Sequence, residues 1–573
     1  MLTPETSSVP IATPLVIGVT SHRNIPAREA ESIRQRVQEF FAQLQHDFPE
    51  LPLVVVSALA EGGDQLVAQE ALDAGARLIA PLPLPLELYA DDFHDPQVHA
   101  TFTSLCARAQ VINLPLLPDN TAHGICTPGP QRDRQYGQAG VFIARHCHLL
   151  LAIWDGKPSK RLGGTAQVVE YYLTGTMPGL IERRADARRH LLGLGDERLV
   201  CQIACSRDTP DGAPRAPLHP GEIVWRTLSN TSPANAAMPP AFRTMFKRTA
   251  AFNADWAKYQ ADIDQRQNET VASPLSATDR LFQAADWLAI HFSHRVLLAM
   301  RTIYTLAALM AIAFNIYDNV PDQDSFIYVF LLLFAAGVLL SAMAKRRDWH
   351  RKYLDYRALA EGLRVQSYWQ RAGISLTGDP EFAQDSFLQK QDIELGWTRN
   401  VMRSVRLGST HTKSANPATD LQAVIHEWVG DADHAGQLDY FAGKAAQRTR
   451  QLHITEAIGR ASLYIGIGIS VMLAVLAHWL SADTKNAAVI AMATFSILAA
   501  VREAYAYKKA DKELIKQYRF MQRIFTAARS ALEDAADATE QRHILRSLGE
   551  TALAEHAEWA VMHRQRPLEH GKF

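Results

Sequence analysis

The chain contains few cysteines and no excess of charge of either sign. Among its 573 residues are 5 cysteines, an odd and scattered number, which is untypical of a disulfide framework and indicates a reducing compartment. The 59 basic and 60 acidic residues leave a formal net charge of −1, so we expect no direct binding of nucleic acid. Cys201 and Cys205 with His190 or His219 match no common zinc spacing, so no metal site is expected.

Four apolar segments in the second half lack charged side chains altogether. They form two pairs, Thr302 to Tyr317 with Phe326 to Ala344 and Ala461 to Leu480 with Ala487 to Val501. The two longer segments, of about 20 residues at about 1.5 Å per residue, can cross a hydrocarbon layer about 30 Å thick. Each shorter segment is joined to a longer one by a polar turn, so the pattern predicts two transmembrane hairpins. The alternative, a soluble all-helical domain, is disfavoured because charge-free runs of this length are rare in soluble cores.

Basic residues flank both predicted hairpins on the same side. They are Arg295, Arg301, Lys345, Arg346, Arg347, Arg448, Arg450, Arg460, Arg502, Lys508 and Lys509. Because positive residues near span ends mark the cytoplasmic side, both termini and the long central segment are predicted to be cytoplasmic. The residues before Leu15 lack the basic flank and apolar core of a signal peptide. We therefore expect a multi-pass protein of the inner (cytoplasmic) membrane that contacts membrane lipid.

Upstream of the spans, short apolar runs alternate with helical patterns. The expected strands are Leu15–Thr20, Leu53–Ser57, Arg77–Pro81, His148–Trp154, Leu199–Cys205 and the short Glu222–Thr227. The expected helices include Ala27–Gln45, Gln135–Arg145, Ala241–Gln267 and one from Ala277 that runs directly into the first span. This alternation predicts an α/β, Rossmann-like, doubly wound parallel sheet, followed by an all-α membrane region.

The dinucleotide fingerprint G-x-G-x-x-G is absent, which disfavours classical NAD-dependent redox chemistry. Open parallel sheets bind ligands beyond the carboxyl ends of their strands, where loops meet helix N-termini. Loops of this kind, with glycines, hydroxyls and charges, predict a site for a nucleotide phosphate or ribose. The candidate binding residues are Gly18, Thr20, Ser21, His22, Arg23, Glu61, Gly62, Gly63, Asp64, Asp155, Gly163, Gly164, Thr165 and Glu170.

These residue types have distinct chemical uses. Glycine permits close approach of the backbone to a ligand, and Arg23 offers charge-assisted hydrogen bonds. Asp64 at a helix start would repel a phosphate, so we expect it to cap the helix or to bind a ribose hydroxyl. His22 and Glu170 also fit ordinary polar surface positions.

The order of these motifs resembles the SLOG superfamily of Rossmann-like nucleotide-binding domains, which are related to Lonely Guy and Smf proteins. The resemblance covers about residues 10 to 230 and rests on GVTSHR, SALAEGGDQLVAQEAL, LIAPLPLPLELYADDF, LLLAIWDG and GGTAQVVE. It implies a small nucleotide or nucleotide-derived ligand and no certain further cofactor.

Enzymatic Lonely Guy proteins carry G-G-x-G-T-x-x-E, in which the glycines hold phosphate and the glutamate, with an arginine, serves N-glycosidic cleavage. Here the glycine pair and Glu170 keep the register, but Ala166 and Gln167 replace the second Gly-Thr pair. Arg134, or Arg132, could supply the arginine. Hydrolysis therefore stays an alternative, with Glu170 and Arg134 as its catalytic residues.

The run WHRKYLDYRALAEGLRVQSYWQ, after the first predicted hairpin, is similar to SLATT domains. These two-transmembrane effectors are found beside SLOG sensors in bacterial conflict systems. The resemblance implies membrane disruption or pore formation in antiviral defence, triggered by a nucleotide signal. Tyr356-Arg357 and Tyr518-Arg519 follow the two hairpins at similar but unequal distances, which is compatible with a duplicated unit of weak residue-level identity. Ordinary amphipathic helices show the same pattern.

The expected function is a nucleotide-sensing membrane effector that forms a homo-oligomer, because four spans can scarcely surround a water-filled path. The alternatives are a membrane-anchored nucleotide N-glycosidase and a constitutive oligomeric channel. The expected parts are a SLOG-like domain at residues 1–230, a helical connector at 231–290, and SLATT-like units at 291–415 and 416–573.

Overall fold

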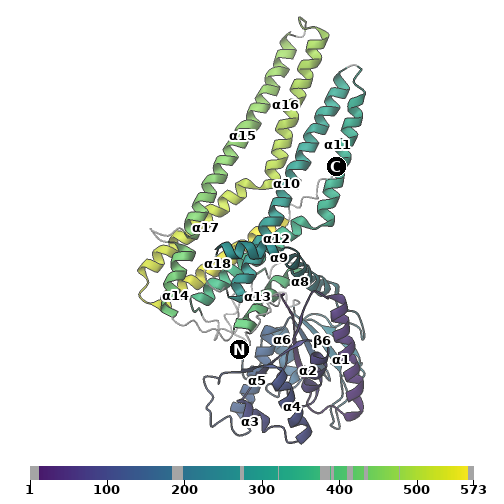
Figure 1. Cartoon of the computed structure of the whole chain (residues 1–573), viewed down its shortest axis with the longest axis vertical. Coiled ribbons are helices and arrows are strands. Elements are labelled where there is room, and N and C mark those ends of the chain that lie inside the picture. Colours follow the sequence, from purple (N-terminus) through teal and green to yellow (C-terminus); the bar gives the residue numbers. More distant parts are fainter. Residues whose placement is uncertain are drawn as a thin grey trace, which may run out of the picture. The chain divides into compact units, whose positions relative to one another are not determined.

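The polypeptide divides into two compact units, of which the first is discontinuous in sequence. The computed structural model describes residues 12–182, 198–270, 276–320, 322–374, 387–388, 393–409, 417–430, 436–476 and 478–564 (Figure 1). The first unit takes in Met1–Ala277 and Leu376–Lys413, and the second takes in Thr278–Ser375 and Ser414–Phe573. The chain therefore passes between the two units three times. The sequence analysis expected residues 291–415 to form one unit and did not foresee that Leu376–Lys413 belong to the first unit.

The first unit is built on a seven-stranded sheet with the order β4-β3-β2-β1-β5-β6-β7. Neighbouring strands pair in parallel, except that β6 and β7 are antiparallel. The strands are β1 (Leu15–Ser21), β2 (Leu53–Val56), β3 (Arg77–Leu82), β4 (Gln110–Asn113), β5 (Leu149–Trp154), β6 (Leu199–Ala204) and β7 (Ile223–Arg226). The expected parallel α/β sheet is confirmed for β1 to β6, whereas β7 pairs antiparallel. Edge strand β4 escapes prediction because only two of its four residues are apolar.

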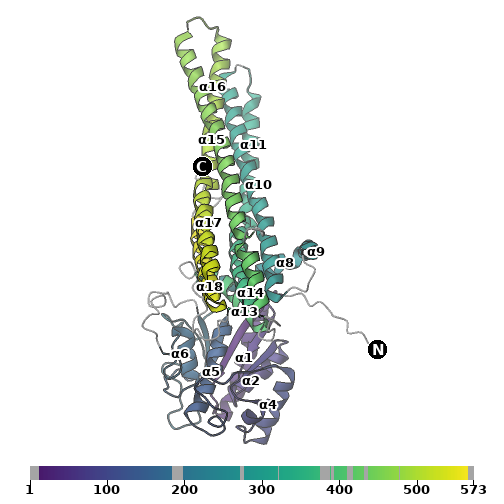
Figure 2. The ribbon, with the colours of Figure 1, turned by 90° about the vertical axis from the view of Figure 1, so that its left-hand side faces the viewer.

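Helices cover both faces of this sheet (Figure 2). They are α1 (Ala27–Asp47), α2 (Gly63–Asp73), α3 (Leu86–Ala90), α4 (Pro96–Arg108), α5 (Pro130–His146) and α6 (Thr165–Thr174). Side chains of α5 and α6 share a core with Val16, Val56 and Leu150. Helix α2 instead begins against the side chain of Ile153. Successive side chains of a strand point to opposite faces, so Ile153 lies on the face opposite to Leu150, Ala152 and Trp154. Helix α1 packs beside α2, so these two helices cover the opposite face.

Two helices from distant parts of the sequence complete the first unit, α8 (Pro240–Lys258) and α13 (Gly396–Ser409). Asn253 of α8 accepts hydrogen bonds from the backbone N–H and the hydroxyl of Thr13, at 3.0 and 2.6 Å. Because Thr13 precedes β1, α8 lies at the amino-terminal end of the sheet. The 3₁₀ turn η3 (Ile393–Leu395) and α13 pack on α8, and Trp397 at the start of α13 is fully buried.

The helix expected at Ala241–Gln267 is broken in two. Helix α8 ends before Tyr259, and α9 (Gln260–Thr270) follows. The backbone of Tyr259 has φ −109° and ψ 17°, which is outside the α-helical region and interrupts the ladder of hydrogen bonds.

The second unit is entirely helical in the part that the structure describes. Its helices are α10 (Ala277–Asn319), α11 (Ser325–Arg346), α12 (Trp349–Arg371), α14 (Pro417–Val424), the π-helix η4 (Ile425–Val429), α15 (Gln437–Leu476), α16 (Ala482–Lys509), α17 (Asp511–Asp534) and α18 (Ala538–Arg564). The 43-residue helix α10 confirms that one helix runs from Ala277 into the first apolar segment. In Figures 1 and 2, α10 lies beside α11 and α15 lies beside α16.

Four helical stretches are long and apolar enough to cross a membrane. None of the most apolar window of α11 or of α16 is buried, and Leu332 and Leu339 of α11 are 71% and 69% exposed. A continuous exposed apolar surface of this kind is unfavourable in water and suits contact with lipid. These helices indicate a multi-pass membrane protein. Within the apolar region, Asn315 of α10 donates to the carbonyl of Ile490 in α16 at 3.0 Å, and buried amides commonly join spans in this way.

The two halves of the second unit share one backbone feature. A residue in the left-handed conformation, Asp348 with φ 52° or Ala510 with φ 53°, separates α11 from α12 and α16 from α17. Tyr356 is the eighth residue after Asp348, and Tyr518 is the eighth residue after Ala510. The Tyr-Arg pairs therefore lie at the same distance from these breaks, a spacing that supports a duplicated unit.

Candidate functional site

Loops after β1, β2 and β5 meet at the carboxyl ends of the strands. The amide of Gly63 donates to the carbonyl of His22 at 3.3 Å, so the start of α2 touches the loop after β1. The Thr165 hydroxyl, at the start of α6, donates to the carbonyl of Ser21 at 2.7 Å. The structure therefore brings together three of the sequence motifs that were predicted to form one site.

We call the loops after β1, β2 and β5 the loop cluster, and Asp155, at the end of β5, makes several of its contacts. Its side chain is fully buried, lies 3.1 Å from His22 Nε2, and accepts hydrogen bonds from Arg207 Nε at 2.7 Å and from the amide of Lys157 at 3.0 Å. Burial opposes ionisation of Asp155, but the hydrogen bond from His22 and the nearby positive charge of Arg207 outweigh it and hold the pKa of Asp155 below its ordinary value. Asp155 thus fastens the loops after β1, β5 and β6 to one another.

Asp64 lies beside Ser21 in the first turn of α2. The Ser21 hydroxyl donates to the Asp64 carboxylate at 2.6 Å, and α2 has no side-chain cap, so the helix-capping role considered for Asp64 is not observed. Burial raises the pKa of Asp64 to about 6, although the Ser21 hydroxyl and the charge of Arg23 act in the opposite direction. A carboxyl group with this pKa exchanges its proton near neutral pH.

Three of the predicted glycines permit close approach of the chain to itself. A Cβ atom on Gly62, where φ is +88°, would lie 2.3 Å from the carbonyl oxygen of Arg23. A Cβ on Gly163, where φ is +73°, would lie 2.7 Å from the amide nitrogen of Gly137 in α5. Gly18 lies within β1 against Cys147 at the end of α5, where a Cβ would lie 2.8 Å from the Cys147 sulfur. These glycines hold the loops and helices of the site together.

The exposed part of the cluster is basic. Arg23 is exposed and lies over the ring of Tyr136, 5.6 Å from its centroid. The loop between β5 and α6 adds Lys157, Lys160 and Arg161, of which the last two are exposed. Cationic side chains at strand ends are suited to an anionic group such as a phosphate.

A second network, which the sequence interpretation missed, supports Tyr136. The Tyr136 hydroxyl donates to Asp92, and Arg132 donates to the same carboxylate at 2.7 Å. Arg132 is 6% exposed and also donates to the carbonyl of Ile125. Asp92 lies within the quoted run LIAPLPLPLELYADDF but was not among the candidate binding residues, because it follows α3 in an irregular segment and meets Arg132 and Tyr136 of α5 only in the folded chain.

The remaining predicted residues are less central. Thr20 is buried near the end of β1, Glu61 is half-buried beside Gly62, and Gly164 donates its amide to the carbonyl of Arg161. Glu170 is exposed on α6.

The arginine considered for N-glycosidic cleavage has a different partner. Arg134 Nη2 lies 3.0 Å from Asp119 Oδ2, and no ion pair joins Arg134 to Glu170 within the described residues. Gln167, which occupies the position of the motif's threonine, is 4% exposed. Its Oε1 atom is buried without a hydrogen-bond partner among the described residues, so it can accept a hydrogen bond from a ligand.

No protein-family model matches this chain, and no curated protein sequence matches it. These two comparisons therefore assign neither a ligand nor a reaction to the loops after β1, β2 and β5.

Proposed function

We propose that this protein is a membrane effector controlled by a nucleotide-type ligand that binds at the carboxyl ends of β1, β2 and β5. The observation that carries the proposal is the threefold passage of the chain between an α/β unit with a basic loop cluster and a unit with four apolar helices. The α/β unit that would bind the ligand is thereby connected covalently to the helical unit at three points.

The chemistry of the loop cluster favours a ligand with both phosphate and neutral polar groups. Arg23, Lys160 and Arg161 supply exposed positive charge for a phosphate. The buried Gln167 Oε1 offers an acceptor to a hydroxyl or amino group. Two residues earlier, the Thr165 hydroxyl donates to the backbone carbonyl of Ser21, so the start of α6 contacts the loop after β1. A nucleotide carries all of these groups.

Coupling between the units requires the ligand to bind one arrangement of the chain more tightly than another. Helix α10 continues without interruption from the end of the first unit into an apolar segment, so a change at its start is transmitted along a stiff element. A second connection is α13, which belongs to the first unit and is joined at both of its ends to the second.

The proposal includes four finer statements. The four apolar helices form two transmembrane hairpins in the inner membrane, with both termini in the cytoplasm. Several copies assemble around a pore. The α/β unit is a SLOG-type sensor and the helical unit a pair of SLATT-type effectors. Opening of the pore in an infected bacterial cell would serve antiviral defence.

Small molecules retained by the purified full-length chain provide the test of ligand class. Acid extraction followed by mass spectrometry should find a phosphate-bearing nucleotide with the wild type and much less of it with Arg23→Ala. Arg28→Ala is the matched control, because the Arg28 side chain is 82% exposed and lies on α1 rather than in the loop cluster. Retention of no nucleotide by the wild type, or equal retention by Arg23→Ala, would contradict the proposed site.

Vesicles containing the full-length chain then test the effector step. The extracted nucleotide should release an encapsulated dye from wild-type vesicles but not from Arg23→Ala vesicles. Release that ignores the nucleotide would indicate a constitutive channel instead. Appearance of free base from the nucleotide, abolished by Glu170→Gln, would favour the N-glycosidase.

A further inference from the structure

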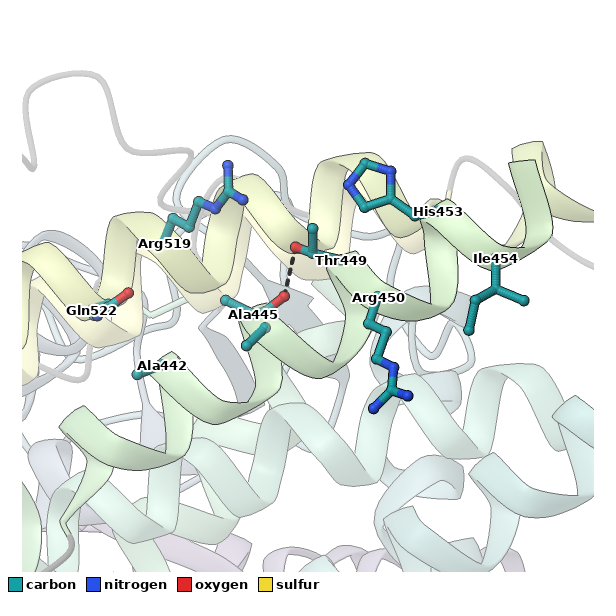
Figure 3. A pocket seen from close by; sticks show the side chains of 9 residues that line it. Ala442, Ala445, Thr449, Arg450, His453, Ile454, Arg519 and Gln522 are labelled. Carbon is teal, nitrogen blue, oxygen red and sulfur yellow. Dashed lines mark hydrogen bonds between the residues drawn. The ribbon is translucent and has the colours of Figure 1, made fainter. Parts of the chain in front are cut away.

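A cavity of about 610 Å³ lies on α15 and α17, in the second unit (Figure 3). Ala442 and Ala446 of α15 contribute small side chains to it, whereas Arg450, His453 and Arg519 contribute basic ones. In Figure 3, Arg519 and His453 extend in the same direction, and Arg450 extends to the other side of α15. The cavity therefore has small apolar walls and basic groups at two edges.

The basic groups at this cavity have no acidic partners within the described part of the chain. Arg519 forms no ion pair there, and neither do Arg450 and His453. Arg357, which occupies the place of Arg519 in the first half of the unit, pairs with Glu361 at 2.5 Å and with Asp286 at 3.4 Å. One arginine of the two is thus neutralised by its own chain, while Arg519 is available to an external anion.

The position of the cavity along α15 indicates where that anion comes from. A hydrocarbon layer about 30 Å thick takes about 20 helical residues, which from the last residue of α15, Leu476, reaches back to the neighbourhood of Ile458. Ile454, which lines the cavity, lies about one helical turn further back, at the depth of lipid headgroups. Ile454 and Ile458 are 51% and 59% exposed, so an apolar surface leads from the cavity toward the span.

We infer that this cavity binds the phosphate headgroup of an anionic phospholipid, with an acyl chain lying along Ile458 toward the apolar part of α15. This inference rests on the membrane insertion included in the proposed function. Basic pockets between spans at the cytoplasmic side are suited to such headgroups. A bound lipid would contact α15 and α17 together, and would therefore stabilise the arrangement in which these two helices pack.

Native mass spectrometry of the full-length chain tests this inference. The detergent-purified protein is mixed with phosphatidylglycerol or with the zwitterionic phosphatidylcholine, and the retained lipid is measured. We expect the wild type to retain phosphatidylglycerol preferentially. Arg450→Ala/Arg519→Ala should weaken its apparent affinity roughly 30-fold. Each arginine near an anionic headgroup contributes about 1 kcal/mol to binding, and the roughly 30-fold change corresponds to the loss of about 2 kcal/mol for the two together.

The matched control removes the same charge from α17 away from the cavity. Arg523→Ala/Arg529→Ala should change retention less than about twofold, because Arg523 does not line the cavity and Arg529 pairs with Glu533 on the exposed surface. Equal losses in the two double variants would overturn the inference. Displacement of the lipid by excess inorganic phosphate would also overturn it, because the cavity would then recognise free phosphate.

Membrane association is measured separately on carbonate-washed membranes. Loss of the wild-type chain from these membranes would refute the proposed function itself. A chain that stays in the membrane but retains phosphatidylglycerol no better than phosphatidylcholine would refute only the lipid site.

Discussion

At the scale of single residues, the loop cluster depends on buried carboxylates that have different surroundings. Asp155 is held ionised by His22, Arg207 and the amide of Lys157. Asp64 accepts a hydrogen bond from the Ser21 hydroxyl and lies near the charge of Arg23, but its burial outweighs both. The same functional group is therefore structural at one position and titratable near neutral pH at the other.

Replacing Asp155 by Asn should destabilise the first unit. The substitution removes the charge that Arg207 and His22 face in a fully buried position, and breaking a buried pair typically costs about 3 kcal/mol or more. In a unit of this size, about 3 kcal/mol corresponds to a fall of about 4 to 5 °C in the thermal midpoint. Tryptophan fluorescence of the solubilised full-length chain measures this midpoint. Asp119→Asn is the control, since its partner Arg134 is bonded at the surface and the midpoint should move by less than about 2 °C.

Asp64 should make stability depend on pH. Its pKa of about 6 in the folded chain exceeds the ordinary 3.8, so folding favours the protonated carboxyl, and stability is lost as pH rises from about 4 through about 6. Asp64→Asn keeps an acceptor for Ser21 but cannot ionise. The variant should therefore gain stability over the wild type at pH 7.5 by up to about 3 kcal/mol relative to the difference at pH 4. Parallel denaturation curves at both pH values would contradict this assignment.

At the scale of elements, α2 shows how two glycines at the ends of one helix have different roles. Gly62 precedes α2 and Gly75 follows it, with φ values of +88° and +79°. A Cβ on Gly62 would collide with the carbonyl of Arg23, whereas a Cβ on Gly75 would meet nothing within 4 Å. The first glycine is required by a contact between loops and the second only by its backbone conformation.

Alanine at these two positions separates the two causes. Gly75→Ala should cost about 1 kcal/mol, which is the expected strain of a left-handed non-glycine residue. Gly62→Ala should cost about 3 kcal/mol or more, because the clash with Arg23 is added to the strain, and it should also reduce nucleotide retention. Chemical denaturation of the full-length chain measures both. Equal costs at the two positions would show that the loops after β1 and β2 do not pack as described.

At the scale of the whole molecule, the chain joins a parallel α/β unit to a helical unit with four apolar helices. The connection is not a single linker, since Leu376–Lys413 returns to the α/β unit before the chain enters α15. Any motion that separates the two units must therefore be accommodated at three chain crossings, a constraint that favours coordinated changes over independent ones.

Cysteine labelling in spheroplasts tests the proposed topology. The native cysteines all lie in the first unit, and Cys126 is exposed there. A membrane-impermeant maleimide should label the wild type only after lysis, because the proposed topology puts that unit in the cytoplasm. Asp324→Cys, before α11, and Ala482→Cys, at the start of α16, should be labelled in intact spheroplasts. Labelling of Cys126 before lysis would contradict the predicted orientation. Labelling of neither introduced cysteine in intact spheroplasts would contradict the two predicted hairpins.

The sequence by itself determined the class of each unit, because periodicity and the absence of charge are local properties. Alternation of apolar runs with helices was enough to predict a parallel sheet, which the structure shows in β1 to β6, and charge-free runs were enough to predict four apolar helices. The grouping of Ser21, Gly63 and Thr165 followed from the rule that parallel strands end at one edge.

Only the tertiary structure decided what these residues contact. The bond from Arg207 to Asp155 and the pairing of Arg134 with Asp119 join residues far apart in the sequence, and local pattern carries no information about such partners. The same holds for the segment after α12 that rejoins the first unit and for Arg519 at the α15–α17 cavity, which has no ion-pair partner among the residues that the structure describes. The sequence shows where an arginine stands along a helix. Its ion-pair partner depends on which distant segment the fold brings within reach.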